Sequence, residues 1–198
     1  MRTDRQRIIL ASASPRRREL LALMGVRDFA VIPAREEEAP PADLGPAETV
    51  REIALMKARD VAAREPGLVI AADTLVWQDG ALLGKPADGA EAAAMLRRLS
   101  GRKHTVFSGV AVLADGRELT DFEATDVWFR EMSEEEIRFY VASGEPLDKA
   151  GAYGAQGLGS LFVRRIEGDF FNVMGLPVCR LGLMLKACGV DLASLNEG

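Results

Sequence analysis

Residues 10–20 read Leu-Ala-Ser-Ala-Ser-Pro-Arg-Arg-Arg-Glu-Leu, where a short apolar strand at residues 8–10 gives way to a helix. Ser14 is a favoured N-cap residue, and Pro15 suits the first helical position because its missing amide hydrogen would have no partner there. Three arginines, Arg16–Arg18, follow in the first turn, where the helix dipole disfavours cations. An anion such as a phosphate chain would explain them, and the alternative is a solvated basic surface.

The composition predicts an acidic chain that folds throughout. The 198 residues are 48% hydrophobic, enough for one sizeable core or two small lobes, and we expect a single domain over 1–198 with an ordered core at about 8–190. A net charge of −5 argues against broad nucleic-acid binding, which needs a basic footprint, but allows one small anionic ligand.

The cysteines, the histidine and the apolar runs indicate the cellular compartment and exclude some classes of protein. Cys179 and Cys188 are expected to be buried free thiols in a reducing compartment. The single histidine, His104, excludes a histidine-rich zinc site and is expected on a strand or at the surface. The apolar run after the polar N-terminus is too short for a signal peptide, and no run approaches the roughly 20 residues that span a bilayer. We therefore expect a cytoplasmic protein without a membrane partner.

Strand and helix signals alternate along the chain, which predicts an α/β fold with a mixed twisted sheet flanked by helices, in two lobes with a cleft between them. Asp79-Gly80 and Asp115-Gly116 are turn signals, and Ser133 with Glu136 is a capping box. The expected strands are 8–10, 29–32, 68–72, 105–113, 119–129 and 161–166, and the expected helices start at 15, 46, 88, 133 and 176.

Asp73 is the first candidate for chemistry outside the arginine turn. It follows the apolar run 68–72, so we expect it at the carboxyl end of a strand covered on both faces, where ligands gather in open α/β sheets. A carboxylate there can hold a divalent metal or take a proton from water. The alternative is an aspartate that caps a turn.

A glycine-rich stretch at 148–159 is the second candidate, because its backbone could approach a ligand closely. Within it, Tyr153 could stack on a base, and the Gln156 amide could pair with the edge of uracil or thymine. An ordinary flexible loop is the alternative. Lys85 lies between Gly84 and Pro86 and could meet phosphate as a point charge, although a plain turn explains it equally.

Six motifs then occur in the same order as in the Maf family, and the resemblance covers about residues 8–185. Each motif alone is weak, but the combination is highly specific. The motifs are Ser12-x-Ser14-Pro15-Arg16-Arg17, Ala72-Asp73-Thr74, Gly84-Lys85-Pro86, Leu99-Ser100-Gly101, Asp148-Lys149-Ala150-Gly151-Ala152-Tyr153-Gly154 and Gly175-Leu176-Pro177.

The resemblance implies a nucleoside triphosphate pyrophosphatase, which cleaves between the α and β phosphates and releases a nucleoside monophosphate and pyrophosphate. It implies a divalent cation, Mg²⁺ or Mn²⁺, and a fold similar to inosine triphosphate pyrophosphatases, with a deep cleft and often a homodimer. The family was first tied to inhibition of septum formation in bacteria.

The resemblance also assigns residues. It implies that Asp73 is the general base, and that phosphate-binding and catalytic roles fall on Ser12, Arg17, Glu37, Lys57 and Lys85. The three positions that separate the family's branches are here Arg16, Thr74 and Gln156. This combination resembles the branch that acts on dTTP and UTP, whereas the sister branch for 7-methylated GTP carries Trp, Gln and Glu.

The expected mechanism neutralises the triphosphate with Arg17, Lys57 and Lys85, while a metal held by Glu37 and Asp73 bridges phosphates and polarises water. Asp73 could be base, ligand or both. The alternatives are a pyrophosphatase for 7-methyl-GTP or modified pyrimidine nucleotides, and a nucleotide-binding regulator of division that hydrolyses little.

Overall fold

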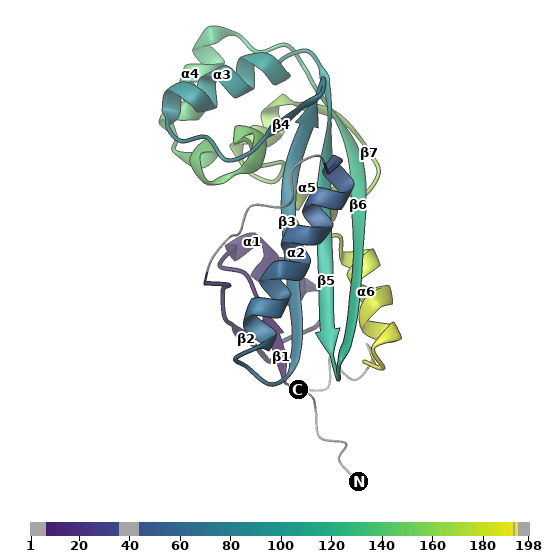
Figure 1. The fold of residues 1–198 in the computed structure, drawn as a ribbon. Coiled ribbons are helices and arrows are strands. Elements are labelled where there is room, and N and C mark those ends of the chain that lie inside the picture. The colour runs from purple at the N-terminus through teal and green to yellow at the C-terminus, as the bar shows by residue number, and fades with distance from the viewer. Residues whose placement is uncertain (1–6, 36–43, 192, 194–198) are drawn as a thin grey trace. The chain divides into compact units, whose positions relative to one another are not determined.

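The computed structural model describes residues 7–35, 44–191 and 193 (Figure 1). The strands are β1 (Ile8–Leu10), β2 (Phe29–Val31), β3 (Leu68–Gln78), β4 (Ala81–Leu83), β5 (Lys103–Ala114), β6 (Arg117–Phe129) and β7 (Val163–Glu167). The α-helices are α1 (Pro15–Leu23), α2 (Pro46–Ala62), α3 (Gly89–Leu99), α4 (Glu134–Ala142), α5 (Phe170–Met174) and α6 (Val178–Ala187). Three short 3₁₀ helices are η1 (Glu145–Asp148), η2 (Ala150–Ala152) and η3 (Leu158–Phe162).

The described strands form one mixed sheet in the order β2-β1-β3-β5-β6-β7, with β4 paired to β3. β1 runs parallel to both β2 and β3, whereas β3 with β4 and β6 with β7 are antiparallel pairs. This confirms the predicted α/β class with a mixed sheet and flanking helices. The cleft stays a prediction.

The chain divides into two compact units. The first holds residues up to Asp73, Ser108–Glu123 and the chain from Gly175 onward; the second holds Thr74–Phe107 and Ala124–Met174. β3, β5 and β6 contribute residues to both units.

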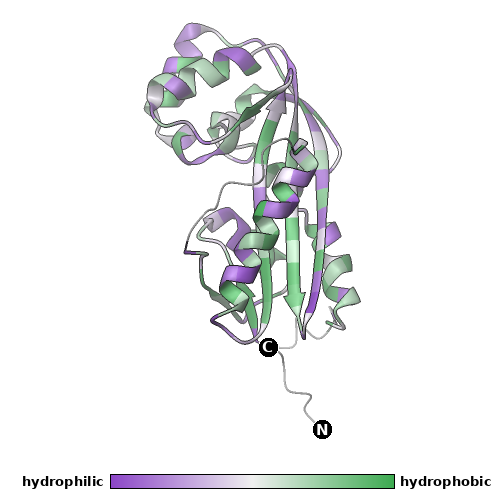
Figure 2. Ribbon diagram, in the orientation of Figure 1, coloured by the Kyte–Doolittle hydropathy of each residue, from purple (hydrophilic) through white to green (hydrophobic). Residues whose placement is uncertain are grey.

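The core of the first unit lies between helix α2 and the sheet, and Figure 2 shows hydrophobic residues running along β5. The residues of α2 that face the sheet, Ala54, Ala58 and Val61, are fully buried, and their small side chains let the helix pack closely. They meet the strand residues Ile9, Ala11, Val69, Ala71, Ala111 and Leu113.

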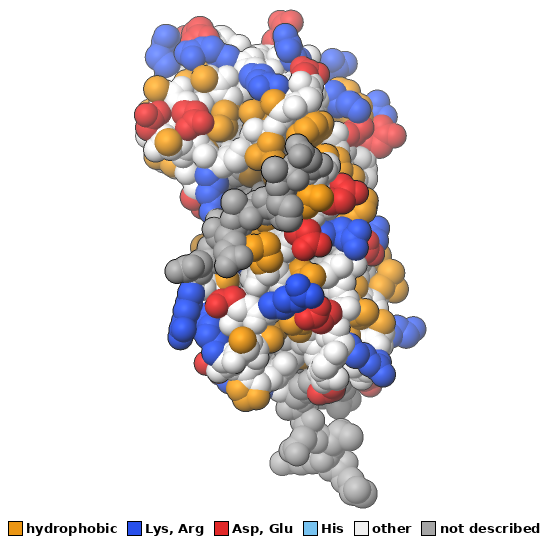
Figure 3. Space-filling model, viewed as in Figure 1, with side chains coloured by type: hydrophobic (Ala, Val, Ile, Leu, Met, Phe, Trp, Pro, Cys, Tyr) orange, Lys and Arg blue, Asp and Glu red, His pale blue; other side chains and the backbone are white. Residues whose placement is uncertain are grey.

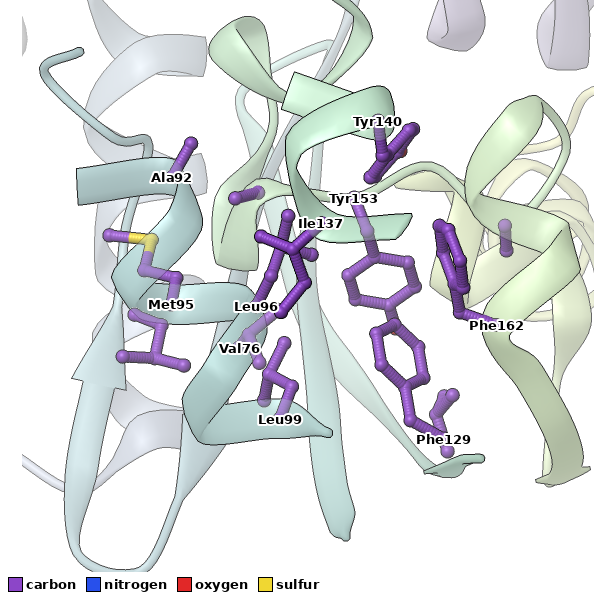
Figure 4. Close-up of a cluster of buried hydrophobic side chains, with 14 of the residues drawn as sticks. Val76, Ala92, Met95, Leu96, Leu99, Phe129, Ile137, Tyr140, Tyr153 and Phe162 are labelled. Carbon is purple, nitrogen blue, oxygen red and sulfur yellow. The ribbon is translucent and has the colours of Figure 1, made fainter. Parts of the chain in front are cut away.

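The core of the second unit packs α3 and α4 against the ends of β3, β5 and β6 (Figure 4). Aromatic rings pack together there: Phe129 and Tyr153 meet edge to face with centroids 4.7 Å apart, and Tyr140 and Phe162 are tilted to one another with centroids 5.2 Å apart. Such pairs contribute about 0.5–1.5 kcal/mol beyond their burial.

Two predicted hairpin turns and the predicted capping box of α4 are confirmed. Asp79 and Gly80 adopt positive φ values of 48° and 78°, and Asp115 and Gly116 adopt 50° and 76°, as hairpin turns of the primed type require. The Ser133 capping box at α4 is complete, since the Ser133 hydroxyl accepts from the Glu136 amide and the Glu136 side chain accepts from the Ser133 amide.

Three expectations about elements are wrong. The strand predicted at 68–72 continues to Gln78, and the short helix α5 was not foreseen. Cys179 is exposed and Cys188 is half-buried, so the two free thiols are not core residues. They lie on α6 and just after it, and the apolar face of that helix is formed by Leu181, Met184 and Leu185.

The surface carries charges of both signs. On the face shown in Figure 3, Lys and Arg side chains are interspersed with Asp and Glu. Within the described ranges, no helix combines the length and apolar character that spanning a bilayer requires.

Candidate active site

A lysine and an aspartate form a nearly buried ion pair in the first unit. The Lys57 ammonium donates to the Asp73 carboxylate over 2.8 Å, and their side chains are only 10% and 19% exposed. Lys57 lies on α2, and like Ala54 and Ala58 on the same helix it is buried, whereas Asp73 lies on β3. Removing two charges from water costs several kcal/mol per ion, so a pair this sheltered marks a candidate functional site.

A glycine on β5 sets the position of this lysine. A Cβ at Gly109 would stand 2.7 Å from the Arg51 backbone nitrogen and nearer still to the Val50 carbonyl, so only glycine lets the backbone of α2 lie against the strand. Lys57 follows Val50 by two helical turns, about 10 Å along the axis. The contact at Gly109 therefore fixes the height of α2 over the sheet and the reach of Lys57 to Asp73.

Asp73 does not stand where the sequence placed it. The strand continues through Asp73 and Thr74 to Gln78, so Asp73 is an internal strand residue rather than a strand-end cap. The expectation failed because aspartate is depleted in strands, and the sequence alone does not reveal the lysine that receives it. A hydrogen-bonded partner makes the carboxylate tolerable at this position.

The loop after β1 holds the second group of the first unit. The Arg17 guanidinium donates through Nη1 to the Ser12 hydroxyl (3.1 Å) and through Nε to the Gly175 carbonyl (2.9 Å). The Ala11 amide donates to the Ile70 carbonyl (2.7 Å), so the chain leaving β1 still follows β3 as it approaches Ser12. Ser12, to which Arg17 is hydrogen-bonded, thus directly follows the residue that continues the pairing of β1 with β3.

The helix start at α1 differs from expectation in one detail. Ser14 occupies the N-cap position and Pro15 the first turn, as predicted, but the Ser14 side chain makes no capping hydrogen bond. Its amide instead donates to the Ser12 hydroxyl over 3.3 Å. The first turn of α1 contains no acidic residue, Arg16 and Arg17 are half-buried, and Arg18 is exposed.

The remaining candidates belong to the second unit. Thr74 is half-buried on β3, and Lys85 and Gln156 are both exposed. The Gly151 amide donates to the Gly84 carbonyl over 3.0 Å, which ties the segment before Lys85 to the segment that leads to Gln156.

Tyr153 is not available to stack on a base. It is only 6% exposed, and its hydroxyl lies 2.8 Å from Nε2 of His104, which is itself 1% exposed. Burial lowers the pKa of His104 to about 4 and raises the pKa of Tyr153. The pair is a neutral core contact, and the strand placement of His104 is confirmed.

Besides Gly109, two residues that organise the site were missed by the sequence analysis. Gly175, whose carbonyl holds Arg17, lies within a quoted motif but had no assigned role. Glu145 receives hydrogen bonds from the backbone of Leu158 and Gly159, and no periodicity signals such a partner. The proximity of the Glu145 side chain to Gly157 becomes visible only in three dimensions.

A divalent metal at this site would depend on carboxylate ligands. Glu37 lies outside the described residues, and the described ranges contain no cluster of three or more His, Cys, Asp or Glu side chains that could hold an ion. Mg²⁺ often binds through only one or two carboxylates together with substrate phosphates, and Asp73 fits that pattern.

Solved structures define the fold class. The chain is similar to a HAM1 protein from Coxiella burnetii, with a TM-score of 0.52 and 19% identity over 92% of this chain and 99% of that one. It is similar to the Staphylococcus aureus Ham1 protein with a TM-score of 0.51 and 14% identity, covering 92% and 99%. These likenesses place it in the Ham1 fold class.

The Maf-like protein family profile matches residues 7–188, and the chain belongs to this family. A protein of Methanosarcina mazei named dTTP/UTP pyrophosphatase is 50% identical over 94% of this chain and 96% of its own length. Proteins with the same name from Symbiobacterium thermophilum and Bacillus cereus are 51% and 49% identical, over 98% and 94% of this chain and 100% and 98% of theirs.

Proposed function

We propose that this protein is a nucleoside triphosphate pyrophosphatase that hydrolyses dTTP and UTP to the monophosphate and pyrophosphate. The observation that carries the proposal is identity of about one half, over nearly the whole chain, to relatives named dTTP/UTP pyrophosphatase. The nearly buried Lys57–Asp73 pair supports it, because the residues that the resemblance assigned to catalysis are the ones in contact.

Asp73 acts on the attacking water in this proposal. Lys57 fixes one carboxylate oxygen at 2.8 Å, which leaves the other oxygen to orient the water or to accept its proton. Arg17 is held by Ser12 and Gly175, so its guanidinium is already ordered before a phosphate arrives. Preorganised cations stabilise the charge that develops on the phosphates, which is the main demand of this chemistry. Lys85 is assigned to the same triphosphate.

We propose that a divalent cation, Mg²⁺ or Mn²⁺, enters with the triphosphate and is held by Asp73 and Glu37. When bound, it supplies charge neutralisation of phosphate oxygens and a lowered pKa for water. Base selection falls to Arg16, Thr74 and Gln156. The exposed Gln156 amide offers both a donor and an acceptor, which suits the carbonyl and N–H edge of uracil and thymine.

Pyrophosphate release with Mg²⁺ or Mn²⁺, across the standard nucleoside triphosphates and 7-methyl-GTP, tests the proposal. We expect dTTP and UTP to be cleaved preferentially, and Asp73→Asn to lose activity by about a thousandfold while its circular dichroism stays that of the parent. Glu135→Gln, an exposed change on α4, is the matched carboxylate control and should be neutral.

Other outcomes of this assay would support a different substrate or a different function. Preference for 7-methyl-GTP or for modified pyrimidine nucleotides would overturn the substrate assignment alone. Tight binding of dTTP without turnover would favour a nucleotide-binding regulator of division.

We further propose that residues 1–198 form one Maf-like domain that acts in the cytoplasm as a homodimer. The homodimer rests on likeness to the family and is tested by sedimentation equilibrium, where a mass of one chain, 21.4 kDa, would refute it.

A further inference from the structure

Glu145 gathers three hydrogen bonds beneath the segment that carries Gln156. Its Oε1 accepts from the Tyr140 hydroxyl (2.8 Å) and from the Gly159 amide (3.1 Å), and its Oε2 accepts from the Leu158 amide (2.8 Å). Burial alone would raise the pKa of Glu145, but these hydrogen bonds leave it below its ordinary value. Glu145 is thus a charged, well-satisfied acceptor rather than a surface carboxylate.

The Tyr140 hydroxyl extends this contact to the other side of Gln156. Tyr140 is fully buried on α4, and its oxygen accepts from the Gly154 amide over 3.1 Å while its proton goes to Glu145. The chain is therefore pinned at Gly154 and again at residues 158–159, and Gln156 lies on the turn between the two.

The glycines of this segment make room for the hydrogen bonds to Glu145 and Tyr140. A Cβ at Gly157 would stand 2.6 Å from the Glu145 carboxyl carbon, and a Cβ at Gly159 would stand 2.5 Å from the Tyr140 hydroxyl. Close packing on Glu145 and Tyr140 thus explains these two glycines, while the approach of a ligand to this backbone stays a prediction.

We propose that Glu145, acting with Tyr140, is a positioning residue for base selection: it holds the 154–159 segment in the one conformation that presents Gln156 to the nucleobase. The inference rests on the proposed function, in which Gln156 reads the base. Gln156 is exposed while its neighbour Ala155 is buried, so the side chain of Gln156 is offered to solvent from a fixed backbone. Because the loop is already ordered, nucleotide binding does not have to restrict its conformation, and the entropy cost of binding is smaller.

Glu145→Gln tests the proposal, because an amide nitrogen cannot accept from the backbone donors that the carboxylate serves. We expect KM for dTTP and UTP to rise about tenfold with kcat within about twofold, and the preference over purine triphosphates to fall by a similar factor. Tyr140→Phe keeps the ring against Phe162 and removes only the hydroxyl. If Glu145→Gln does not fold, the same rise in KM and loss of base preference are expected of Tyr140→Phe.

A double-mutant cycle with Gln156→Ala separates positioning from general stability. If Glu145 acts through Gln156, Glu145→Gln should change KM by less than about twofold in the Gln156→Ala background. A lower melting temperature with unchanged KM and base preference, or a KM effect of equal size in both backgrounds, would overturn the inference. Wild-type protein that cleaves no nucleotide would instead defeat the proposed function itself.

Discussion

Replacing Gly109 by alanine should damage the candidate active site from a distance. The added methyl group would meet the backbone of α2, at 2.7 Å from the Arg51 nitrogen and closer to the Val50 carbonyl, whereas ordinary contacts begin at about 3.4 Å. A side chain could rotate away, but a helix backbone cannot, so α2 must retreat by well over half an ångström. That displacement carries Lys57 away from Asp73.

The magnitude follows from the geometry. Overpacking of this kind destabilises by about 1–3 kcal/mol, and a backbone contact belongs at the upper end of that range. For a chain of 198 residues this lowers the melting temperature by about 2–4 °C for each kcal/mol. A catalytic group displaced by nearly 1 Å reduces kcat/KM by about a hundredfold.

Urea unfolding and pyrophosphate release measure the two effects. Gly45→Ala is the matched control at the start of the same helix. Among the described residues, a Cβ there meets only the movable carboxylate of Glu48, so the change should cost less than about 1 kcal/mol with turnover close to that of the parent. A Gly109→Ala protein with the stability and the turnover of the parent would refute the role given to this contact.

Three further outcomes are expected. Lys57→Met and Asp73→Asn should each destabilise by about 3 kcal/mol, and the double variant by at least about 1 kcal/mol less than their sum; additive urea-unfolding energies would contradict the ion pair. His104 has a pKa near 6.5 in the unfolded chain and about 4 in the folded protein, so between these values only the unfolded state binds the proton. The free energy of unfolding should therefore decrease as the pH is lowered from 6.5 toward 4, by up to about 1.4 kcal/mol per pH unit. His104→Gln should flatten that slope in unfolding curves from pH 6.5 to 5, and an identical slope in both proteins would count against the buried neutral ring. Iodoacetamide should label exposed Cys179 before half-buried Cys188, whose thiol pKa is raised by burial, and peptide mass spectrometry showing the reverse order would contradict their placement.

The sequence predicted most elements because local chemistry decides them. The Ser133 capping box and the Asp79-Gly80 turn each depend on residues within a few positions, and both are confirmed. The α/β class likewise followed from alternating patterns. Where a long-range partner decides, prediction failed: Asp73 continues a strand because Lys57, sixteen residues earlier, receives its carboxylate.

The candidate site shows the same division. The resemblance assigned roles to Lys57 and Asp73, of which only Asp73 lies in a quoted motif, and the structure brings the two into contact. Tyr153 was placed at the base because it borders glycines, but its hydroxyl partner His104 is 49 residues away and holds it in the core. The roles of Glu145 and Gly109 depend on neighbours that only the fold supplies, so residue type and spacing could not reveal them.

The first unit is assembled from three separate stretches of the chain, the last of which begins at Gly175 and contains α6. A ribosome releasing this polypeptide therefore exposes Lys57 and Asp73 long before the carbonyl that orders Arg17 has emerged. At about 5–20 residues per second, the hundred residues between Asp73 and Gly175 correspond to roughly 5–20 seconds of synthesis. The contact that orders Arg17 therefore forms late in synthesis, and a chain truncated before Gly175 would lack it however well its earlier segments had folded.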